Sequence, residues 1–181
     1  SYSMSMTYAL PFGKGKQFLG NSSKALDLII GGWSIQGSQL IHSGTPLQVT
    51  QTNANTGCNG CTQLPNATGV AAQTDGSVDQ RIYEWVNPAA FTAAPAYTFG
   101  NVSPRIPVYS PPLFNIDASM FKTFTFKERV KFQFRAEALN LTNTVLFASP
   151  TLNVNSPSTF GVITSQTNFP RLIQLGGRIT F

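Results

Sequence analysis

Apolar and polar side chains alternate along several stretches of this chain, and the first stretch is the most regular. Between residues 1 and 12 the odd positions are small or polar, and the even positions are Tyr2, Met4, Met6, Tyr8, Leu10 and Phe12. Because successive side chains of a strand point to opposite faces, this pattern predicts a β-strand with one apolar face. Its length exceeds the roughly 5 to 6 residues of a common globular strand and suits the roughly 9 to 11 needed to cross a bilayer at a tilt.

The same alternation predicts four further strands. They span residues 32–50, 113–126, 130–141 and 171–181. The clearest is 130–141, where Val130, Phe132, Phe134, Ala136 and Ala138 alternate with Lys131, Gln133, Arg135 and Glu137. In 113–126 the apolar set contains one exception, Lys122, near one end of the strand. A lysine in that place can extend its ammonium group to a membrane interface, so the exception is tolerable there.

The connections between these strands differ greatly in length. Residues 13–31 form a connection with a short helical turn expected at 23–30, and Lys127-Glu128-Arg129 is expected to form a tight charged turn. Residues 51–112 and 142–168 are long loops rich in Asn, Ser, Thr and Pro. Compact soluble domains seldom hold connections beyond about 12 to 15 residues, whereas outer-membrane barrels combine long external loops with short periplasmic turns.

Aromatic residues in the first long loop indicate that it packs on itself. They are Tyr83, Trp85, Phe91, Tyr97, Phe99 and Tyr109. A flexible tether would have little use for so many large side chains.

The expected fold is therefore all-β: an antiparallel up-and-down meander of about five long strands, part of a transmembrane β-barrel with long external loops. If residue 181 ends on the periplasmic side, the connections at 13–31 and 127–129 are periplasmic and both long loops are external. The alternative is a secreted all-β binding or adhesive module whose aromatic faces pack as a sandwich core. Such a module predicts shorter and more evenly spaced connections.

The final segment alternates up to its last residue. Its pattern resembles the C-terminal assembly signal of bacterial outer-membrane β-barrels, with Gln174, Gly176, Ile179 and Phe181 in the characteristic positions. That resemblance implies recognition by the barrel assembly machinery. The competing interpretation is the C-terminal edge strand of a soluble β protein, and these residues alone do not decide between the two.

Composition is compatible with a membrane protein that spans the bilayer with β-strands and argues against one that spans it with helices. Charged residues make up 10% of the chain, against about 25% in ordinary soluble domains. Mean hydropathy is −0.03, and no run approaches the roughly 20 apolar residues of a spanning helix, which excludes a helical membrane protein. The net charge of +5 is scattered along the chain and predicts no nucleic-acid surface. No signal peptide opens the sequence, so we expect a mature chain or a piece of one.

Cys58 and Cys61 form a CxxC motif within the long loop. This spacing allows a redox pair, half of a zinc site or a disulfide. A redox motif favours a βαβ context, and zinc needs two further ligands, neither of which is nearby. In an external loop, away from the reducing cytosol, a disulfide is the expected state. No metal or other cofactor is predicted.

Charged side chains lie on the polar faces of the last three predicted strands. They are Asp117, Lys131, Arg135, Glu137 and Arg178. We find no nucleophile with a histidine and no paired acid and base among them, so no enzymatic activity is predicted. The lone histidine, His42, is expected to hydrogen-bond to a neighbour. We interpret the five charged residues as a barrel interior that pairs its own charges and contacts a plug.

Several sequence segments carry a wider resemblance that covers nearly the whole chain in order. They are 8–16 (YALPFGKGK), 31–35 (GGWSI), 43–46 (SGTP), 85–91 (WVNPAAF), 99–101, 117–121, 132–143 (FQFRAEALNLTN), 160–164 and 171–181. Together they resemble the C-terminal part of the barrel of TonB-dependent outer-membrane receptors, in particular the Oar-like branch with a carboxypeptidase-regulatory-like front domain.

The resemblance implies energy-coupled uptake across the bacterial outer membrane, with the external loops as the substrate or partner surface. The implied partners are outer-membrane lipid, the remaining strands and plug of the receptor, and TonB through a missing N-terminal part, with no nucleic acid. Such receptors approach about a thousand residues and close a barrel of about 22 strands. This chain is accordingly expected to be a fragment, and its sequence does not identify a transported substrate.

Overall fold

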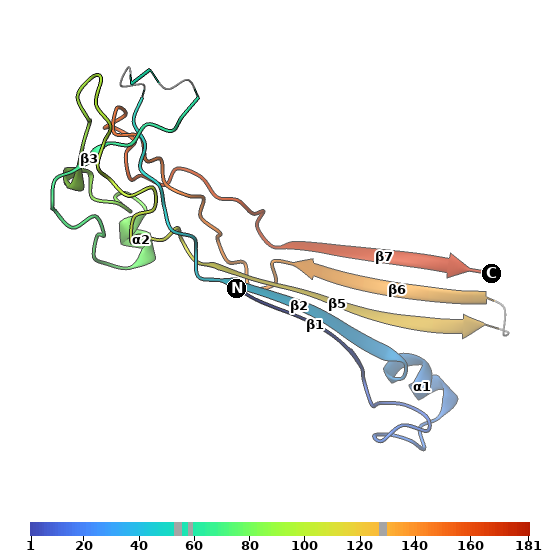
Figure 1. The fold of residues 1–181 in the computed structure, drawn as a ribbon. Coiled ribbons are helices and arrows are strands. Elements are labelled where there is room, and N and C mark those ends of the chain that lie inside the picture. The colour runs from blue at the N-terminus through green and yellow to red at the C-terminus, as the bar shows by residue number, and fades with distance from the viewer. Residues whose placement is uncertain (53–55, 58–59, 127–129) are drawn as a thin grey trace. The chain divides into compact units, whose positions relative to one another are not determined.

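The chain divides into two compact parts. A computed structural model describes all residues except 53–55, 58–59 and 127–129 (Figure 1). The strand unit consists of Ser1–His42, Phe114–Val145 and Asn168–Phe181. The loop unit consists of Ser43–Leu113 and Leu146–Thr167.

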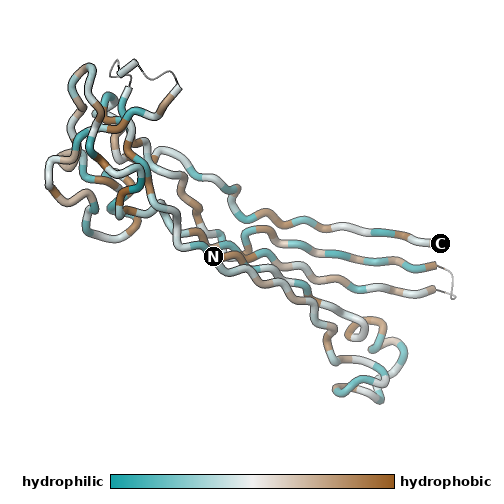
Figure 2. Tube along the Cα trace, in the orientation of Figure 1, coloured by the Kyte–Doolittle hydropathy of each residue, from teal (hydrophilic) through white to brown (hydrophobic). Residues whose placement is uncertain are grey.

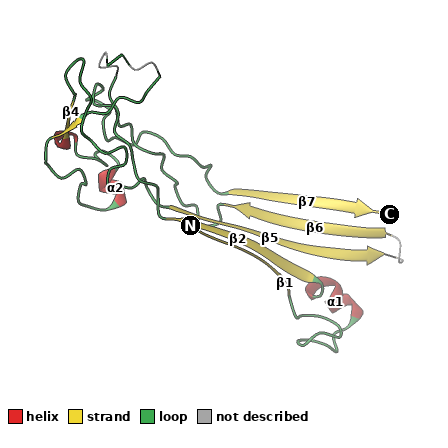
Figure 3. Ribbon diagram, viewed as in Figure 1, coloured by secondary structure: helices red, strands yellow, loops and turns green. Residues whose placement is uncertain are grey.

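The strand unit is built on a five-stranded sheet with the order β1-β2-β5-β6-β7 (Figure 3). The strands are β1 (Tyr2–Ala9), β2 (Trp33–His42), β5 (Leu113–Phe126), β6 (Val130–Leu139) and β7 (Leu172–Thr180). Neighbours in sequence are neighbours in space, so the sheet is a meander. β1 with β2, β5 with β6, and β6 with β7 pair antiparallel. The predicted all-β antiparallel meander is confirmed.

β2 and β5 also run in opposite directions. Gly32 lies beside the Thr123 carbonyl, whereas Gly37, further along β2, lies beside the carbonyl of Asp117, earlier in β5. The meander therefore continues without a crossover from β1 to β7.

The register keeps the alternating faces of neighbouring strands in phase. Met120 lies opposite Ala136, which in turn lies opposite Leu175. One residue along, Glu137 lies between Ser119 and Gln174. Because the side-chain period is two, this register gathers most of the apolar residues on one face of the sheet and most of the polar residues on the other.

The second strand is shorter than its sequence pattern predicts. β2 ends at His42, not near Thr50. Gly44 then adopts a φ of +90° beside the backbone of Ser110, a close approach that a side chain would block. Further along, the Leu47 N–H donates to the Val108 carbonyl at 2.9 Å. The alternating residues after His42 thus belong to the loop unit.

The other long strands also begin or end within a few residues of the expected limits. β1 stops at Ala9, before Pro11, and β6 stops at Leu139, before Asn140 with its φ of +50°. Proline lacks the N–H that a ladder needs, and a positive φ ends an extended strand.

Residues 24–30 form the helical turn expected in the first connection. Helix α1 (Lys24–Ile30) begins where the Ser23 hydroxyl accepts a hydrogen bond from the Leu26 N–H, and it ends at Gly31. Among the described residues no helix is long and apolar enough to cross a membrane.

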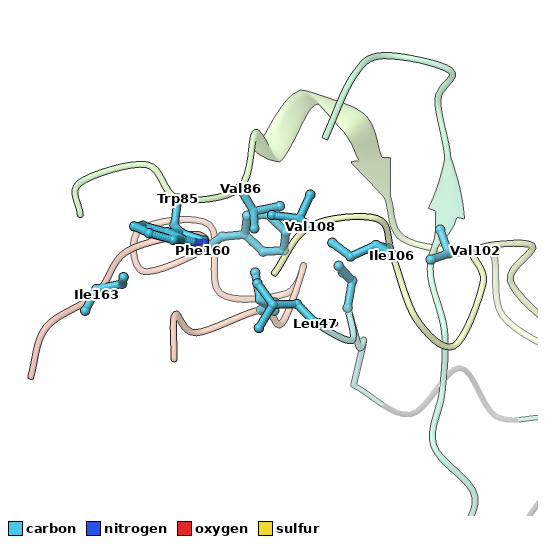
Figure 4. Close-up of a cluster of buried hydrophobic side chains, with 10 residues drawn as sticks. Leu47, Trp85, Val86, Val102, Ile106, Val108, Phe160 and Ile163 are labelled. Carbon is cyan, nitrogen blue, oxygen red and sulfur yellow. The ribbon is translucent and has the colours of Figure 1, made fainter. Parts of the chain in front are cut away.

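The loop unit contains little regular structure, and apolar and polar residues are interspersed along its backbone (Figure 2). It nevertheless has a hydrophobic core (Figure 4). Its elements are the paired β3 (Asn66–Ala67) and β4 (Phe91–Thr92), α2 (Val78–Arg81) and the 3-10 turn η1 (Pro88–Ala90). The buried core consists of Leu47, Val49, Trp85, Val86, Val102, Ile106, Val108, Leu152, Phe160 and Ile163. Both long loops contribute, so they fold together.

Backbone hydrogen bonds join the two loops as well. The N–H groups of Thr50 and Trp85 donate to the carbonyls of Leu152 and Gly161 at 2.8 Å and 2.7 Å. The expectation that aromatic residues hold residues 51–112 together is correct for Trp85, which is buried, and for Phe91, whose ring packs 5.9 Å from that of Phe160. Four others, Tyr83, Tyr97, Phe99 and Tyr109, are exposed, because aliphatic side chains from both loops fill the core instead.

We predict that Trp85→Ala opens the loop unit. The indole is 2% exposed, and its Nε1 donates to the Tyr109 carbonyl at 2.7 Å. Removing a buried tryptophan costs about 3 to 5 kcal/mol, so limited proteolysis should cleave residues 43–113 faster in the variant. Tyr83→Ala, at a side chain 75% exposed, is the control and should leave the cleavage rate unchanged. Equal protection of both variants would contradict a core centred on Trp85.

Candidate functional site

One face of the strand unit exposes large apolar side chains on every strand. They are Tyr2, Met4, Met6, Tyr8, Ile41, Met120, Phe126, Val130, Ile173, Leu175 and Ile179. Isolated apolar residues are common on protein surfaces, but a contiguous apolar face marks contact with a membrane or another protein.

Aromatic contacts on this apolar face join β2, β5 and β6. Trp33 of β2 meets Phe134 of β6 edge to face, with ring centroids 6.4 Å apart. Phe124 and Phe132, one row nearer the strand ends, stack at 6.0 Å. A hollow of about 230 Å³ on this face is lined by Ile35, Ala118, Met120, Ala136, Ala138 and Ile173, among others.

Lys122 lies within this apolar face and has its own partners. The residue is 3% exposed, so its ammonium group is shielded by the protein. Its Nζ donates to the carbonyls of Leu28 and Ile29 at 2.5 Å and 3.0 Å. It also lies 5.4 Å from the ring centroid of Trp33. The last turn of α1 thus supplies the hydrogen bonds that a buried ammonium group requires.

The opposite face carries all five charged residues predicted to line a lumen. The register places Asp117, Lys131, Arg135, Glu137 and Arg178 there. Arg135 Nε and Glu137 Oε1 form an ion pair at 2.7 Å. The structure brings these two together; Lys131 lies opposite Thr180, and Arg178 lies opposite Gln133.

Asp117 stabilises the local structure on this face through two hydrogen bonds. Its Oδ1 accepts the Asn140 N–H at 2.8 Å and its Oδ2 accepts Asn115 Nδ2 at 3.1 Å. The carboxylate therefore fixes the turn that follows β6. Sequence reasoning placed Asp117 on the correct face without finding this role.

Described residues of the polar face line at least two hollows. One, of about 220 Å³, is lined by Gln36, Ser38, Asp117, Ser119, Arg135 and Glu137 among others. The second, of about 380 Å³, is lined in part by Ser3, Ser5, Ser38, Asn115 and Asp117. Short serine side chains leave this space open. The sequence analysis did not predict these serines as site residues. The available signal was the run of serines at odd positions of β1.

The ion pair beside these hollows contributes little to folding. Arg135 and Glu137 side chains are 48% and 29% exposed, and such pairs are worth about 0 to 1 kcal/mol. Their charges remain available to a polar partner on this face. Within the described residues no three His, Cys, Asp or Glu side chains gather as a metal site.

The residues of the expected assembly signal lie on or next to β7. Gln174 and Gly176 are opposite Glu137 and Arg135, and Ile179 is opposite Phe132 on the apolar face. Phe181 follows the strand and is exposed. Recognition of these residues by an assembly factor stays a prediction.

The cysteine motif is only partly within the described structure. Cys61, in the loop unit, is disulfide-bonded. Cys58 lies outside the described residues, so the pairing of the two cysteines stays a prediction.

A meander with an exposed apolar face and an opposite polar face is the architecture of a transmembrane β-barrel wall, which separates hydrocarbon from water. Residues 1–174 match the family model of the outer membrane beta barrel domain, and the chain belongs to this family. No curated protein and no solved structure matches the chain. The protein is an outer-membrane component.

We predict that Lys122→Met loosens α1. The substitution keeps an unbranched apolar stem of similar length to that of lysine but removes the ammonium donor from the Leu28 and Ile29 carbonyls. Hydrogen bonds from a charged group contribute about 1.5 to 3 kcal/mol, so amide exchange in residues 24–31 should accelerate roughly ten-fold or more. Lys131→Met on the polar face is the control and should leave exchange there unchanged. Equal exchange in both variants would show that Lys122 does not hold the helix.

Proposed function

We propose that this chain forms the C-terminal part of the barrel of a TonB-dependent receptor, which takes up a substrate across the outer membrane with energy delivered through TonB. The role is transport, with no catalytic step. The observation that carries the proposal is the sheet itself, which has a polar hollowed face and two open edges.

The open edges call for more strands than the sheet contains. In the described part of the chain, β1 pairs only with β2 and β7 only with β6. Inside a bilayer every backbone N–H and C=O must find a partner, and about eight strands are the practical minimum for closure. A larger barrel, as in these receptors, would satisfy both edges.

The polar face suits contact with a plug. Serine-floored hollows next to the Arg135–Glu137 pair offer space and charge on the side away from lipid. A plug inside a large barrel would place its own polar groups against such a wall. This arrangement supports a receptor over a small barrel whose interior is filled by its own side chains.

The loop unit supports a binding role at the outer surface. It has its own core, yet Tyr97 and Phe99 are 79% and 74% exposed. Tyr97 also adopts a φ of +65°, which is uncommon for a bulky residue and often marks a functional position. We propose that these aromatic residues belong to the surface that meets the substrate or a partner.

The proposal is tested by photo-crosslinking in intact outer membranes. A photoreactive amino acid in place of Ser38, on the polar face, should crosslink to a plug segment of a polypeptide close to about a thousand residues long, which fits a plugged barrel of about 22 strands. The same group in place of the neighbouring Gln39, on the apolar face, is the matched control and should give no such product.

The isolated protein should also crosslink to TonB, whereas a plug-free porin from the same membrane should not. A small protein without a plug crosslink or a TonB contact would overturn the proposal and leave an outer-membrane barrel of another kind.

A further inference from the structure

The connection between β1 and β2, residues 12–31, exposes an unusual number of apolar side chains for a short turn region. They are Phe12, Phe18, Leu19, Leu26, Leu28 and Ile29. The same connection carries the exposed lysines Lys14, Lys16 and Lys24, against a single acidic residue, Asp27. Apolar and cationic groups thus occur together at one end of the sheet.

This connection is an ordered structure. Phe12 and Phe18 pack with ring centroids 5.6 Å apart, and the Gly13 N–H donates to the Phe18 carbonyl at 3.0 Å. The Asp27 carboxylate accepts the Lys14 N–H at 2.6 Å. The one acidic group therefore serves the backbone of the connection.

Leu19 adopts a φ of +59° and is 56% exposed. A leucine in this region of φ is disfavoured, and such conformations persist where the surrounding structure imposes them. The turn therefore holds an apolar side chain toward the outside at a cost in backbone energy.

Helix α1 is fixed on the lipid side of the sheet. Its Ile29 carbonyl accepts hydrogen bonds from Trp33 Nε1 at 2.8 Å and from Lys122 Nζ at 3.0 Å. Trp33 and Lys122 both belong to the apolar face, which meets lipid in this family. The exposed apolar residues of α1 therefore continue the membrane-facing surface beyond the strand end.

We propose that residues 12–31 form a membrane-surface anchor that binds anionic phospholipid at this end of the strands. Its apolar side chains enter the boundary of the hydrocarbon layer, and Lys14, Lys16 and Lys24 contact headgroup phosphates. Elements with an apolar side and a lysine-rich side lie in this way along the plane of a bilayer, and lysines near an anionic surface add to the attraction.

Two features indicate that lipid, and not a protein, covers this anchor: it continues the apolar face of the sheet, and it carries positive charge. The anchor adjoins the lipid-facing side of the sheet, so one bilayer can cover both the anchor and the apolar face. A protein partner would have to compete with lipid for α1, and the exposed lysines of the anchor match phosphate. By the expected topology this is the periplasmic leaflet. The inference rests on the outer-membrane location and is independent of TonB-dependent transport.

The test uses the whole protein reconstituted in nanodiscs of phosphatidylcholine with or without phosphatidylglycerol. A photoreactive amino acid replaces Leu28 in the anchor, and in a parallel sample it replaces Ile173 on the lipid face of β7. Mass spectrometry identifies the adducts. We expect phospholipid adducts at both positions, and at Leu28 a marked enrichment of phosphatidylglycerol over its share of the lipid.

Charge-neutral variants separate the anchor from the rest of the barrel. Each of Lys14→Gln, Lys16→Gln and Lys24→Gln should lower the phosphatidylglycerol preference at Leu28 about five-fold or less, and the triple variant should abolish it. The adduct at Ile173 should not change. Lys131→Gln, on the polar face, is the charge-matched control and should leave both positions unaltered.

Three results would overturn the proposal. The first is a lipid adduct at Ile173 with only protein or solvent products at Leu28, which would indicate a protein partner for α1. The second is a Leu28 adduct without phosphatidylglycerol preference. The third is the absence of lipid products at both positions, which would remove the lipid-facing surface from which the inference starts.

Discussion

A backbone polar group inside the hydrocarbon layer must have a partner, because no water is present to supply one. Between its strands the strand unit follows this rule through the β1-β2-β5-β6-β7 ladder, and only the outer edges of β1 and β7 call for further strands. Lys122 shows the same rule for a side chain: its ammonium group lies in the apolar face but donates to two carbonyls of α1. Those carbonyls are available because they belong to the last turn of a helix, where carbonyls have no partner within the helix. The small helix and the buried lysine thus satisfy each other.

The two units place similar residues in opposite ways. The loop unit buries its aliphatic side chains and Trp85 in a core, as a water-soluble domain does. The strand unit leaves Met4, Leu175 and Ile179 exposed, as the lipid-facing side of an outer-membrane barrel does. The two units therefore suit different surroundings: water for the loop unit and, on its apolar face, lipid for the strand unit. The balanced mean hydropathy of the whole sequence conceals this division.

Alternation predicted the strands and their faces well, because a period of two is a direct consequence of strand geometry. It misplaced the end of β2, since Leu47 and Val49 continue the same period although they belong to the core of the loop unit. Ser43-Gly44-Thr45-Pro46, which contains two residues that break strands, was the available signal. The association of the two long loops was not predictable, because it joins segments far apart in sequence. The partners of Lys122 are backbone groups, which leave no mark in the sequence.

The central claim is that the sheet is one section of a closed barrel in the outer membrane. It is tested most directly by amide hydrogen exchange of β1 and β7 in the protein isolated from outer membranes. The account predicts that the outward-pointing N–H groups of both edge strands exchange as slowly as those of β5 and β6, because further strands pair with them. Rapid exchange along both edges, with β5 and β6 protected, would contradict a closed barrel.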